Sequence, residues 1–447
     1  MRPRSLLLVL LLAALAAPSP APAAPAEADR TDTTDVYETR RNHLLALPKY
    51  AWNALVHPIG RFTIWVEHEQ VPARVLDLFT NEAETFGVFP YGALGGETGT
   101  AGGLTTFHTD LFGRGKGFSA NLIGNRDNYK GAALYDDPGI GGGPWYWNAS
   151  VEALRTGHEN ATINGELRGS GSLLQLEQRD ARITLGRRSN YGETDGYEPE
   201  AVIELRLSHG FREFVADGPL SGGIPGLNEA INQLSVGASA AFDDRDFKAP
   251  TTTISHSLNY QFPGRVLLFA DDHYYSLRDT AFPERGGLAG IEADYVVGSG
   301  DVRYIRYAAE FHRFFTLFYR DRILGIRVRL ENAHPLGEDS LVPYSDMPAL
   351  GGGQRLRGYR RGYFRNQGSL LLGAEYRYPI WDTWNAFLFW DEGQVFGRYG
   401  DLEAGRFEYS FGAGISVRTE RAFLFGLRIA RSEEEKALTG FSLEKEF

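Results

Sequence analysis

The feature that most constrains the fold is a period of two, in which apolar and polar residues alternate in short runs from Thr85 onward. Residues 203–208 and 407–417 are two such runs, each with apolar side chains at every second position and polar or small ones between. Successive side chains of a strand point to opposite faces, so each run predicts a strand with one apolar and one polar face. Glycines and turn residues separate the runs, and the sequence therefore predicts an all-β chain.

A soluble β-sandwich also alternates, and a single run would favour it. Three observations together favour a transmembrane antiparallel β-barrel. The runs continue to the C-terminus without a second composition, the polar faces carry full charges, and aromatic residues cluster near run ends, as in Trp145-Tyr146-Trp147. Lipid outside and a polar lumen inside would explain all three. About 360 residues, at about 22 per strand and connection, predict about 16 strands, because a tilted spanning strand needs about 9 to 11 residues.

Connection length suggests the side on which each connection lies. Residues 136–144, 189–199 and 335–355 are long and rich in glycine or aspartate, and we expect them to be extracellular loops. Residues 418–421 form a tight connection, and we expect a periplasmic turn there.

The N-terminus has the pattern of an export signal. Arg2 and Arg4 precede the apolar run 6–17, and the small residues at 24–26 supply a cleavage site. We therefore expect residues 1–26 to be a signal peptide and the mature protein to reach the cell outer membrane. After residue 26 the sequence has no run of about 18 apolar residues, so it predicts no transmembrane helix.

Residues 27–84 differ from the rest of the chain. A polar, acidic leader comes first, and apolar positions between Pro48, Pro58 and Pro72 then predict short amphipathic helices. We expect either a periplasmic cap or plug, or a helical decoration packed on the barrel rim. The barrel itself is expected at residues 85–447.

Charge and motifs limit the possible chemistry. The formal charge of −11 argues against a nucleic-acid partner, and the absence of cysteine excludes a disulfide scaffold. The sequence contains no G-x-S-x-G, H-E-x-x-H or P-loop motif, and its ten histidines are scattered. We therefore expect no catalytic residues, metal site or cofactor.

A functional site is predicted between residues 351 and 395. The consecutive glycines at 351–353 indicate a bend or a close backbone approach, which places Arg357 in a forced turn. In the strand that follows, Glu375 lies on the face opposite the apolar residues, and Asp391 alternates with Trp390. We expect Arg357, Glu375 and Asp391 to face a common interior.

Three motifs in this stretch resemble the barrel signature of bacterial surface antigens, the BamA/TamA superfamily of outer-membrane insertases and translocators. They are Leu356-Arg357-Gly358-Tyr359, Glu375-Tyr376-Arg377-Tyr378-Pro379 and Phe389-x-Asp391-x-Gly393. In that family the loop arginine folds into the lumen and pairs with acidic residues on the following strands. The resemblance implies this role for Arg357 with Glu375 and Asp391, and it covers about residues 85–447.

Two further stretches support the resemblance. Residues 242–250 are similar to a charged family pattern at a strand end, although alone they would be a solvated turn. Phe441, Leu443 and Phe447 share a predicted strand face at the C-terminus. They resemble the signal that barrel-assembly machinery reads on its clients.

The resemblance implies insertion and assembly of outer-membrane proteins, or protein translocation, through a weakly closed seam between the first and last strands. The implied partners are outer-membrane lipid, unfolded outer-membrane protein clients and periplasmic proteins. One departure is that residues 27–84 are too few for a periplasmic polypeptide-transport-associated domain of this family. The alternative is a passive or gated pore, or an anchoring barrel, with the same fold and no insertase activity.

Overall fold

The computed structural model describes most of the chain from Phe79 onward. The described residues are 79–83, 85–93, 101–125, 128–163, 166–189, 200–217, 224–245, 285–317, 322–353, 355–360, 362–381, 384–418, 423–433 and 437–442. They belong to one compact unit, Val75–Phe447. The predicted signal peptide and nearly all of the predicted helical segment lie outside these ranges. Within them, no helix is long and apolar enough to cross a membrane.

Sixteen strands form one antiparallel sheet in which each strand pairs with the next along the chain. They are β1 (Phe86–Ala93), β2 (Ala101–Leu111), β3 (Lys116–Gly124), β4 (Tyr129–Asp137), β5 (Trp145–Ile163), β6 (Glu166–Arg188), β7 (Glu200–Asp217), β8 (Ala230–Asp243), β9 (Gly286–Gly298), β10 (Arg303–Thr316), β11 (Ile323–Pro335), β14 (Gly368–Trp381), β15 (Trp384–Phe396), β16 (Glu408–Arg418), β17 (Phe423–Ser432) and β18 (Leu438–Ser442). The prediction of an all-β, antiparallel fold of about 16 strands is confirmed.

The remaining elements are small and lie in connections. A two-stranded hairpin, β12 (Ala349–Leu350) with β13 (Phe364–Arg365), is formed inside the connection between β11 and β14. Short 3₁₀ turns are η2 (Ile140–Gly142), η4 (Tyr344–Asp346) and η5 (Tyr399–Asp401).

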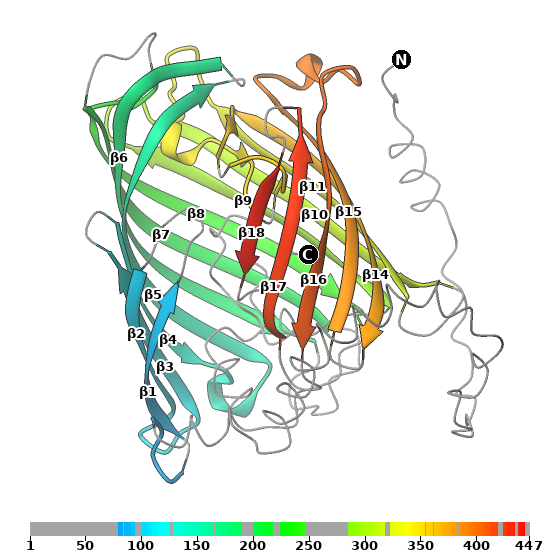
Figure 1. The fold of residues 1–447 in the computed structure, drawn as a ribbon. Helices are drawn as coiled ribbons and strands as arrows, with labels where there is room; N and C mark the ends of the chain where they lie inside the picture. The colour runs from blue at the N-terminus through cyan, green and yellow to red at the C-terminus, as the bar shows by residue number, and fades with distance from the viewer. Residues whose placement is uncertain are drawn as a thin grey trace, which may run out of the picture. The chain divides into compact units, whose positions relative to one another are not determined.

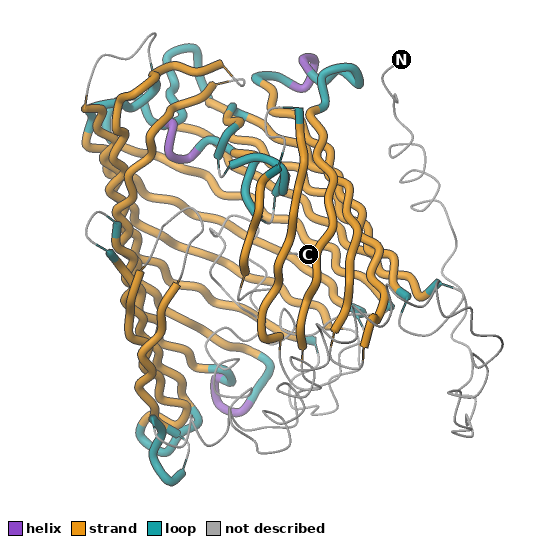
Figure 2. The backbone as a smooth tube through the Cα atoms, in the orientation of Figure 1, coloured by secondary structure: helices purple, strands orange, loops and turns teal. Residues whose placement is uncertain are grey.

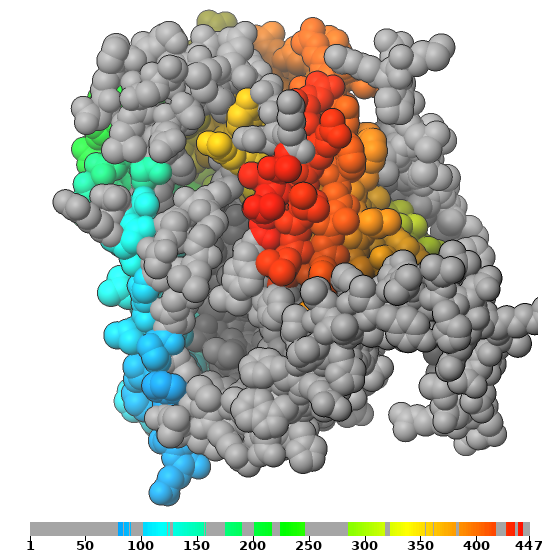
Figure 3. Space-filling model, viewed as in Figure 1, coloured from blue at the N-terminus to red at the C-terminus, as the bar shows by residue number. Residues whose placement is uncertain are grey.

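The sheet curves so that β1 at one edge and β16 to β18 at the other lie on the near side in Figure 1, while middle strands such as β7 and β8 pass behind them. Figure 2 shows the same course of the backbone, with most of the described chain in strands. The N-terminal strands in blue and the C-terminal strands in red are both visible in the space-filling view of Figure 3. Within the described ranges, β1 and β18 are the two edges of the sheet and do not pair with each other.

The polarity of the sheet is the inverse of that of a soluble protein. On β7, Ile203 and Leu205 are 61% and 59% exposed, whereas Glu204 and Arg206, which alternate with them, are 1% and 5% exposed. Charged side chains therefore lie on the inner face and apolar ones on the outer face, which is the pattern of a wall that faces lipid.

Cross-strand packing on the inner face depends on glycine. Tyr146 on β5 pairs directly with Gly186 on β6, and the tyrosine ring lies over the glycine. This position lets the Tyr146 hydroxyl donate a 2.6 Å hydrogen bond to Glu204 Oε1, while Ser239 Oγ donates to Glu204 Oε2 at 3.1 Å. The buried carboxylate thus has partners from β5 and β8.

The sides predicted for the four connections are not consistent with one another. Neighbouring strands are antiparallel, so successive connections alternate between the two ends of the sheet. The C-terminal ends of β4, β6 and β16, after which residues 138–144, 189–199 and 419–422 follow in the sequence, therefore lie at the same end of the sheet. The β11–β14 connection (336–367) lies at the opposite end. Length and composition do not determine the end, because only the number of preceding strands does.

The Tyr146–Gly186 pair leads to a stability prediction. A Cβ atom at residue 186 would lie 2.1 Å from Tyr146 Cζ, so Gly186→Ala must displace the ring from Glu204. Overpacking of this kind costs about 1–3 kcal/mol of unfolding free energy. Urea denaturation of the folded protein in lipid vesicles, followed by heat-modifiable migration on gels, measures this loss. Gly102→Ala is the control, since its Cβ would meet nothing within 4 Å. Equal stability of the two variants would contradict the proposed packing role.

Candidate functional site

The connection between β11 and β14, residues 336–367, turns back at its glycine run. Gly351 and Gly352 have φ values of 110° and 103°, in the region that favours glycine. A Cβ at Gly351 would lie 2.1 Å from the carbonyl oxygen of Arg360. The amide of Gly352 donates to the carbonyl of Tyr359 at 2.9 Å, which closes a tight turn. We call residues 351–360 the loop tip; Arg357 lies within it.

Arg357 is fully buried against β14 and β15. Its Nε and Nη2 donate to the two carboxylate oxygens of Asp391 at 2.7 and 2.9 Å, and its backbone amide donates to Asp391 Oδ2 at 3.2 Å. Nη1 donates to Glu375 Oε2, and the guanidinium carbon lies 3.8 Å from the centre of the Phe389 ring. The structure thus brings together the three charged residues that the sequence placed in a common interior.

The register of β14 and β15 explains why one arginine reaches both carboxylates. Asp391 pairs with Gly373, and Glu375 pairs with Phe389, so the two carboxylates are diagonal neighbours on the inner face. Burial alone would lower the pKa of Arg357, but the attraction of Asp391 and Glu375 raises it overall. The guanidinium therefore stays charged and holds its planar, bidentate geometry.

The two residues after Arg357 reach the next strands along the sheet. The carbonyl of Gly358 accepts a 2.9 Å hydrogen bond from Ser432 Oγ on β17, and a Cβ at Gly358 would lie 2.4 Å from Ser410 Cβ on β16. Tyr359 is buried and donates its hydroxyl to Glu408 Oε2 at 3.1 Å. The loop tip therefore contacts four consecutive strands, β14 to β17.

Gly393, the last residue of the third motif, lies on β15 opposite Leu371. A Cβ there would lie 2.7 Å from Leu350 Cδ1, so the glycine makes room for the hairpin that carries the loop tip. Leu350 and Leu371 belong to a buried apolar cluster with Leu356, Tyr359 and Phe364. Gly393 thus acts through packing against the hairpin.

Three further arginines lie around the cluster of Arg357, Glu375 and Asp391, and the sequence alone did not indicate their partners. Arg355 Nη1 donates to Glu331 Oε2 on β11 at 3.2 Å and to the carbonyl of Ala349 at 2.9 Å. The other two are Arg377, whose Nε lies 3.1 Å from Glu375 Oε1, and Arg327, whose Nη2 lies 3.7 Å from Asp391 Oδ1. Alternation places Arg327 and Arg377 on charged strand faces, but it does not indicate which carboxylate each one meets.

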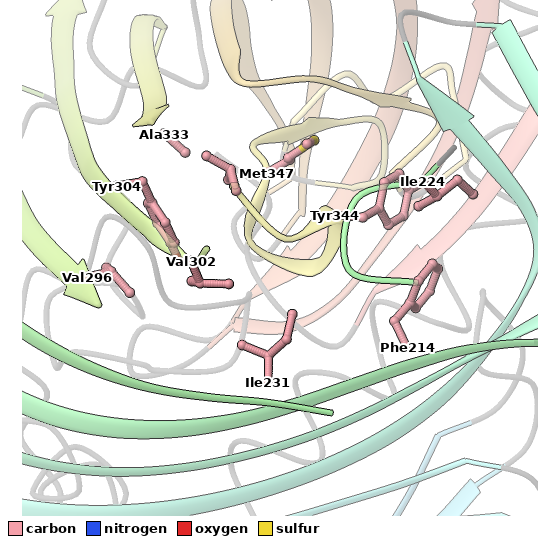
Figure 4. Packing of buried hydrophobic residues seen from close by; sticks show 10 residues of the cluster. Phe214, Ile224, Ile231, Val296, Val302, Tyr304, Ala333, Tyr344 and Met347 are labelled. Carbon is pink, nitrogen blue, oxygen red and sulfur yellow. The ribbon is translucent and has the colours of Figure 1, made fainter. Parts of the chain in front are cut away.

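The first half of the connection, residues 336–348, packs on a different part of the sheet. Figure 4 shows Tyr344 and Met347 of this segment beside wall residues that include Phe214 and Tyr304. The whole cluster is Phe214, Ile224, Ile231, Val296, Val302, Tyr304, Ala333, Val342, Tyr344 and Met347. It joins the connection to the C-terminal ends of β7, β9 and β11 and to the starts of β8 and β10.

Asp346 is the polar anchor of this first half. Arg212 Nε on β7 donates to Asp346 Oδ1 at 3.2 Å, and the Tyr304 hydroxyl on β10 donates to Oδ2 at 3.0 Å. Arg212 also pairs with Asp180 on β6 at 2.8 Å. The connection therefore has two anchors, Asp346 at β7 and β10 and Arg357 at β14 and β15. The sequence analysis did not find the first one.

The remaining predicted positions are only partly described. Phe441 lies in β18, where it pairs with Leu427, whereas Leu443 and Phe447 fall outside the described residues. In the charged stretch that begins at residue 242, Arg245 Nη2 donates to Asp243 Oδ2 at 2.8 Å, directly after β8. In the part of the chain that the structure describes, no group of three His, Asp or Glu side chains is placed to hold a metal ion.

Asp346 leads to a prediction about acidic pH. Burial would raise the pKa of its carboxyl, but Arg212, Arg306 and the Tyr304 hydroxyl lower it overall. A carboxyl with a lowered folded pKa stabilises the fold above the pKa of an unfolded aspartate, about 3.9, and this stabilisation is lost as the pH falls through the folded value. Amide protection of residues 341–347, measured by hydrogen exchange, should therefore decrease below about pH 3.9.

The same measurement on Asp346→Asn should show reduced protection already at neutral pH, with a smaller further loss in acid. Asp339→Asn is the matched control, because Asp339 is an exposed residue of the same connection. Unchanged protection in Asp346→Asn would show that the apolar cluster alone holds this segment.

Comparison with known proteins bears on the fold and the family of the chain. No curated protein matches the chain in sequence. Among solved structures, BamA from Haemophilus ducreyi lacking POTRA domains 1-3 is similar, with a TM-score of 0.53 and 13% identity over 80% of this chain and 70% of that one. CdiB from Escherichia coli has a TM-score of 0.50 and 11% identity, over 80% of this chain and 61% of that one. At these identities the likeness concerns the fold alone.

The family assignment comes from sequence. The model of the Omp85 superfamily domain matches residues 110–430, which include the loop tip and both of its carboxylate partners. The resemblance to outer-membrane barrels of the BamA/TamA type is thereby confirmed, and the chain belongs to the Omp85 superfamily.

Proposed function

We propose that this protein is an outer-membrane β-barrel that inserts or translocates other proteins, with the Arg357 loop tip closing its lumen. The observation that carries the proposal is the loop tip itself. Arg357 is buried between two inner-face carboxylates, and the adjoining Gly358 reaches β17, the strand next to the C-terminal edge. The contacts of Arg357 and Gly358 therefore connect the loop tip both to the charged inner face and to β17, which lies next to the C-terminal edge strand.

Membrane placement is supported by the inverted polarity of the wall. Exposed apolar side chains on the outer face would be stabilised by lipid, whereas the inner face is lined with paired charges that suit a hydrated lumen. Residues 1–26 would direct export, and residues 27–84 would lie in the periplasm before the barrel at 85–447. The partners that follow are outer-membrane lipid, unfolded barrel clients and periplasmic proteins.

The edges of the sheet are where a client strand would pair. An unpaired edge presents backbone donors and acceptors to an incoming strand. Within the described ranges, β18 is the C-terminal edge strand: it pairs with β17 opposite Gly426 to Ala430, and its other side has no partner strand. An incoming strand could pair along that side.

The N-terminal edge is partly covered by the chain itself. The amide of Val88 donates to the carbonyl of Phe79 at 2.9 Å, and the amide of Phe86 donates to Asn81 Oδ1 at 2.9 Å. Two residues further, Pro90 has no N–H to offer. Residues 79–81, here called the edge clasp, therefore occupy the start of β1 on the side away from β2. A client would have to displace the clasp or pair beyond it.

A gated or passive pore is the alternative, and the charged inner face is the observation that favours it. Arg206 pairs with Glu292 at 2.9 Å and with Asp294 at 3.2 Å, and both carboxylates lie on β9. A lumen of this kind would be wet, and ions would pass if the loop tip moved. The two functions differ in what the wild-type protein does to a client.

The first test is planar-bilayer conductance of the refolded mature protein beside Arg357→Ala. Removing one partner of a desolvated ion pair costs about 3–5 kcal/mol, and a wet lumen reduces this. The variant should therefore release the loop tip and conduct, whereas the wild type should stay nearly closed. Arg360→Ala is the matched control, because Arg360 is an exposed residue of the same loop tip.

A folding assay for a small barrel client in the same lipid separates the two functions. The insertase proposal expects the wild type to accelerate client folding. Steady wild-type conductance without acceleration would identify a pore instead. A refolded chain that shows no heat-modifiable, membrane-embedded form would overturn both.

The edge clasp generates a second prediction. Asn81→Ala removes the acceptor of the Phe86 amide and the 3.0 Å hydrogen bond from Asn81 Nδ2 to Thr85 Oγ1. One net hydrogen bond contributes about 1 kcal/mol, so amide exchange at Phe86 and Val88 should become about fivefold faster. If clients pair at this edge, their folding should also be faster. Glu82→Ala is the control, because Glu82 is an exposed residue of the same turn, and it should change neither amide exchange nor client folding. Equal amide exchange in the two variants would show that the Asn81 hydrogen bonds do not hold the clasp on β1.

A further inference from the structure

A hollow in the outer face of β3 to β8 carries an inference that rests on the proposed function, because it requires this face to lie against lipid. Its volume is about 450 Å³. The floor contains Ala133, Ala149 and Ala181, which lie on the adjacent strands β4, β5 and β6. Ala133 and Ala181 both pair with Val151, whose side chain is 55% exposed, so this row faces outward.

Larger apolar side chains surround the alanine floor. Phe118 lies on one side, and Leu207 and Leu234 lie on the other, all of them exposed on the outer face. An empty depression would cost its lining the dispersion contacts that the rest of the wall makes with lipid. A hydrocarbon chain restores these contacts, whereas water would find few polar partners there.

His209 is the polar group at the rim of this hollow. It lies on β7, where it pairs with Ala181 on β6 and with Leu234 on β8, and it is exposed. Within the described ranges its imidazole makes no hydrogen bond or ion pair with the protein. An ionisable side chain on a lipid-facing surface is costly without a partner, which indicates that the partner comes from outside the chain.

The outer face becomes polar one row beyond His209. The next outward residue on β7, Phe211, pairs with Arg179 on β6, whose guanidinium carbon lies 5.4 Å from the phenyl centre. Arg179 also pairs with Glu177, and Glu213 lies opposite Glu177 in the following row. This row of mixed charge marks the edge of the apolar belt. His209 is the hydrogen-bonding group on the hollow's side of that edge.

We propose that the hollow binds one phosphorylated membrane lipid, with an acyl chain over the alanine floor and the phosphate at His209 and Arg179. A neutral or protonated imidazole donates a hydrogen bond to a phosphate oxygen, and the arginine supplies charge from the edge of the belt. Glu177 pairs with Arg179, and Glu213 lies in the row beyond Arg179. The alanine floor itself presents no carboxylate. The occupant is a lipid because the hollow lies within the apolar belt.

The test is native mass spectrometry of the folded full-length protein in detergent, titrated with dioleoyl phosphatidic acid or with dioleoylglycerol, which has the same chains and no phosphate. The wild type should retain one phosphatidic acid. Ala181→Phe fills the floor and should abolish retention. His209→Leu should weaken phosphatidic acid binding about tenfold, the effect of one charge-assisted hydrogen bond, and leave dioleoylglycerol unchanged.

Ala238→Phe is the control for added bulk, because Ala238 is an exposed outward residue of β8 outside the hollow. Equal retention by Ala181→Phe and the wild type would overturn the site. Equal retention of the two lipids by the wild type would overturn phosphate recognition and the proposal with it. Heat-modifiable migration is scored separately. A chain that never folds overturns the proposed function and this site together, whereas a folded barrel without bound lipid overturns this site alone.

Discussion

Backbone hydrogen bonding is the constraint on which the rest of this structure depends. In a lipid environment, every N–H and C=O group of the wall must find its partner within the protein. Pairing each strand with the next along the chain meets this requirement for fourteen of the sixteen strands on both sides, and leaves β1 and β18 as edges. Within the described ranges, that arrangement decides where the two edges of the sheet lie.

Charge inside the sheet creates a second requirement, which the β11–β14 connection helps to meet. A buried carboxylate or guanidinium needs an opposite charge and hydrogen bonds to be tolerated. Asp346 supplies a carboxylate to Arg212 on one part of the wall, and Arg357 supplies a guanidinium to Asp391 on another. The connection is thereby tied to β7 and β10 through one half and to β14–β17 through the other. Movement of the loop tip would change its contacts with β16 and β17, the strands next to β18.

Several features were predictable because they depend on local pattern. A period of two is a property of a single strand, so alternation predicted the strands, and the length of the alternating region predicted that there are about 16. It also placed Glu375 and Asp391 on charged faces, and the glycine run predicted the sharp turn before Arg357. Features that depend on counting or on distant contacts were missed. One miscounted strand reverses the side of a connection, and Asp346 meets Arg212 across 134 residues of sequence.

The sequence by itself determined an all-β chain with an apolar outer face, a charged inner face and an arginine turn directed toward two acidic strands. Each of these features follows from the order and spacing of residues that are close together in the sequence. Only the tertiary structure decided that Asp391 stands opposite Gly373, that Gly358 approaches β16 and β17, that residues 79–81 cover the start of β1, and that three alanines align into a hollow. These depend on the register between strands and on the curvature of the sheet, and the alternation of a single strand is the same for many registers.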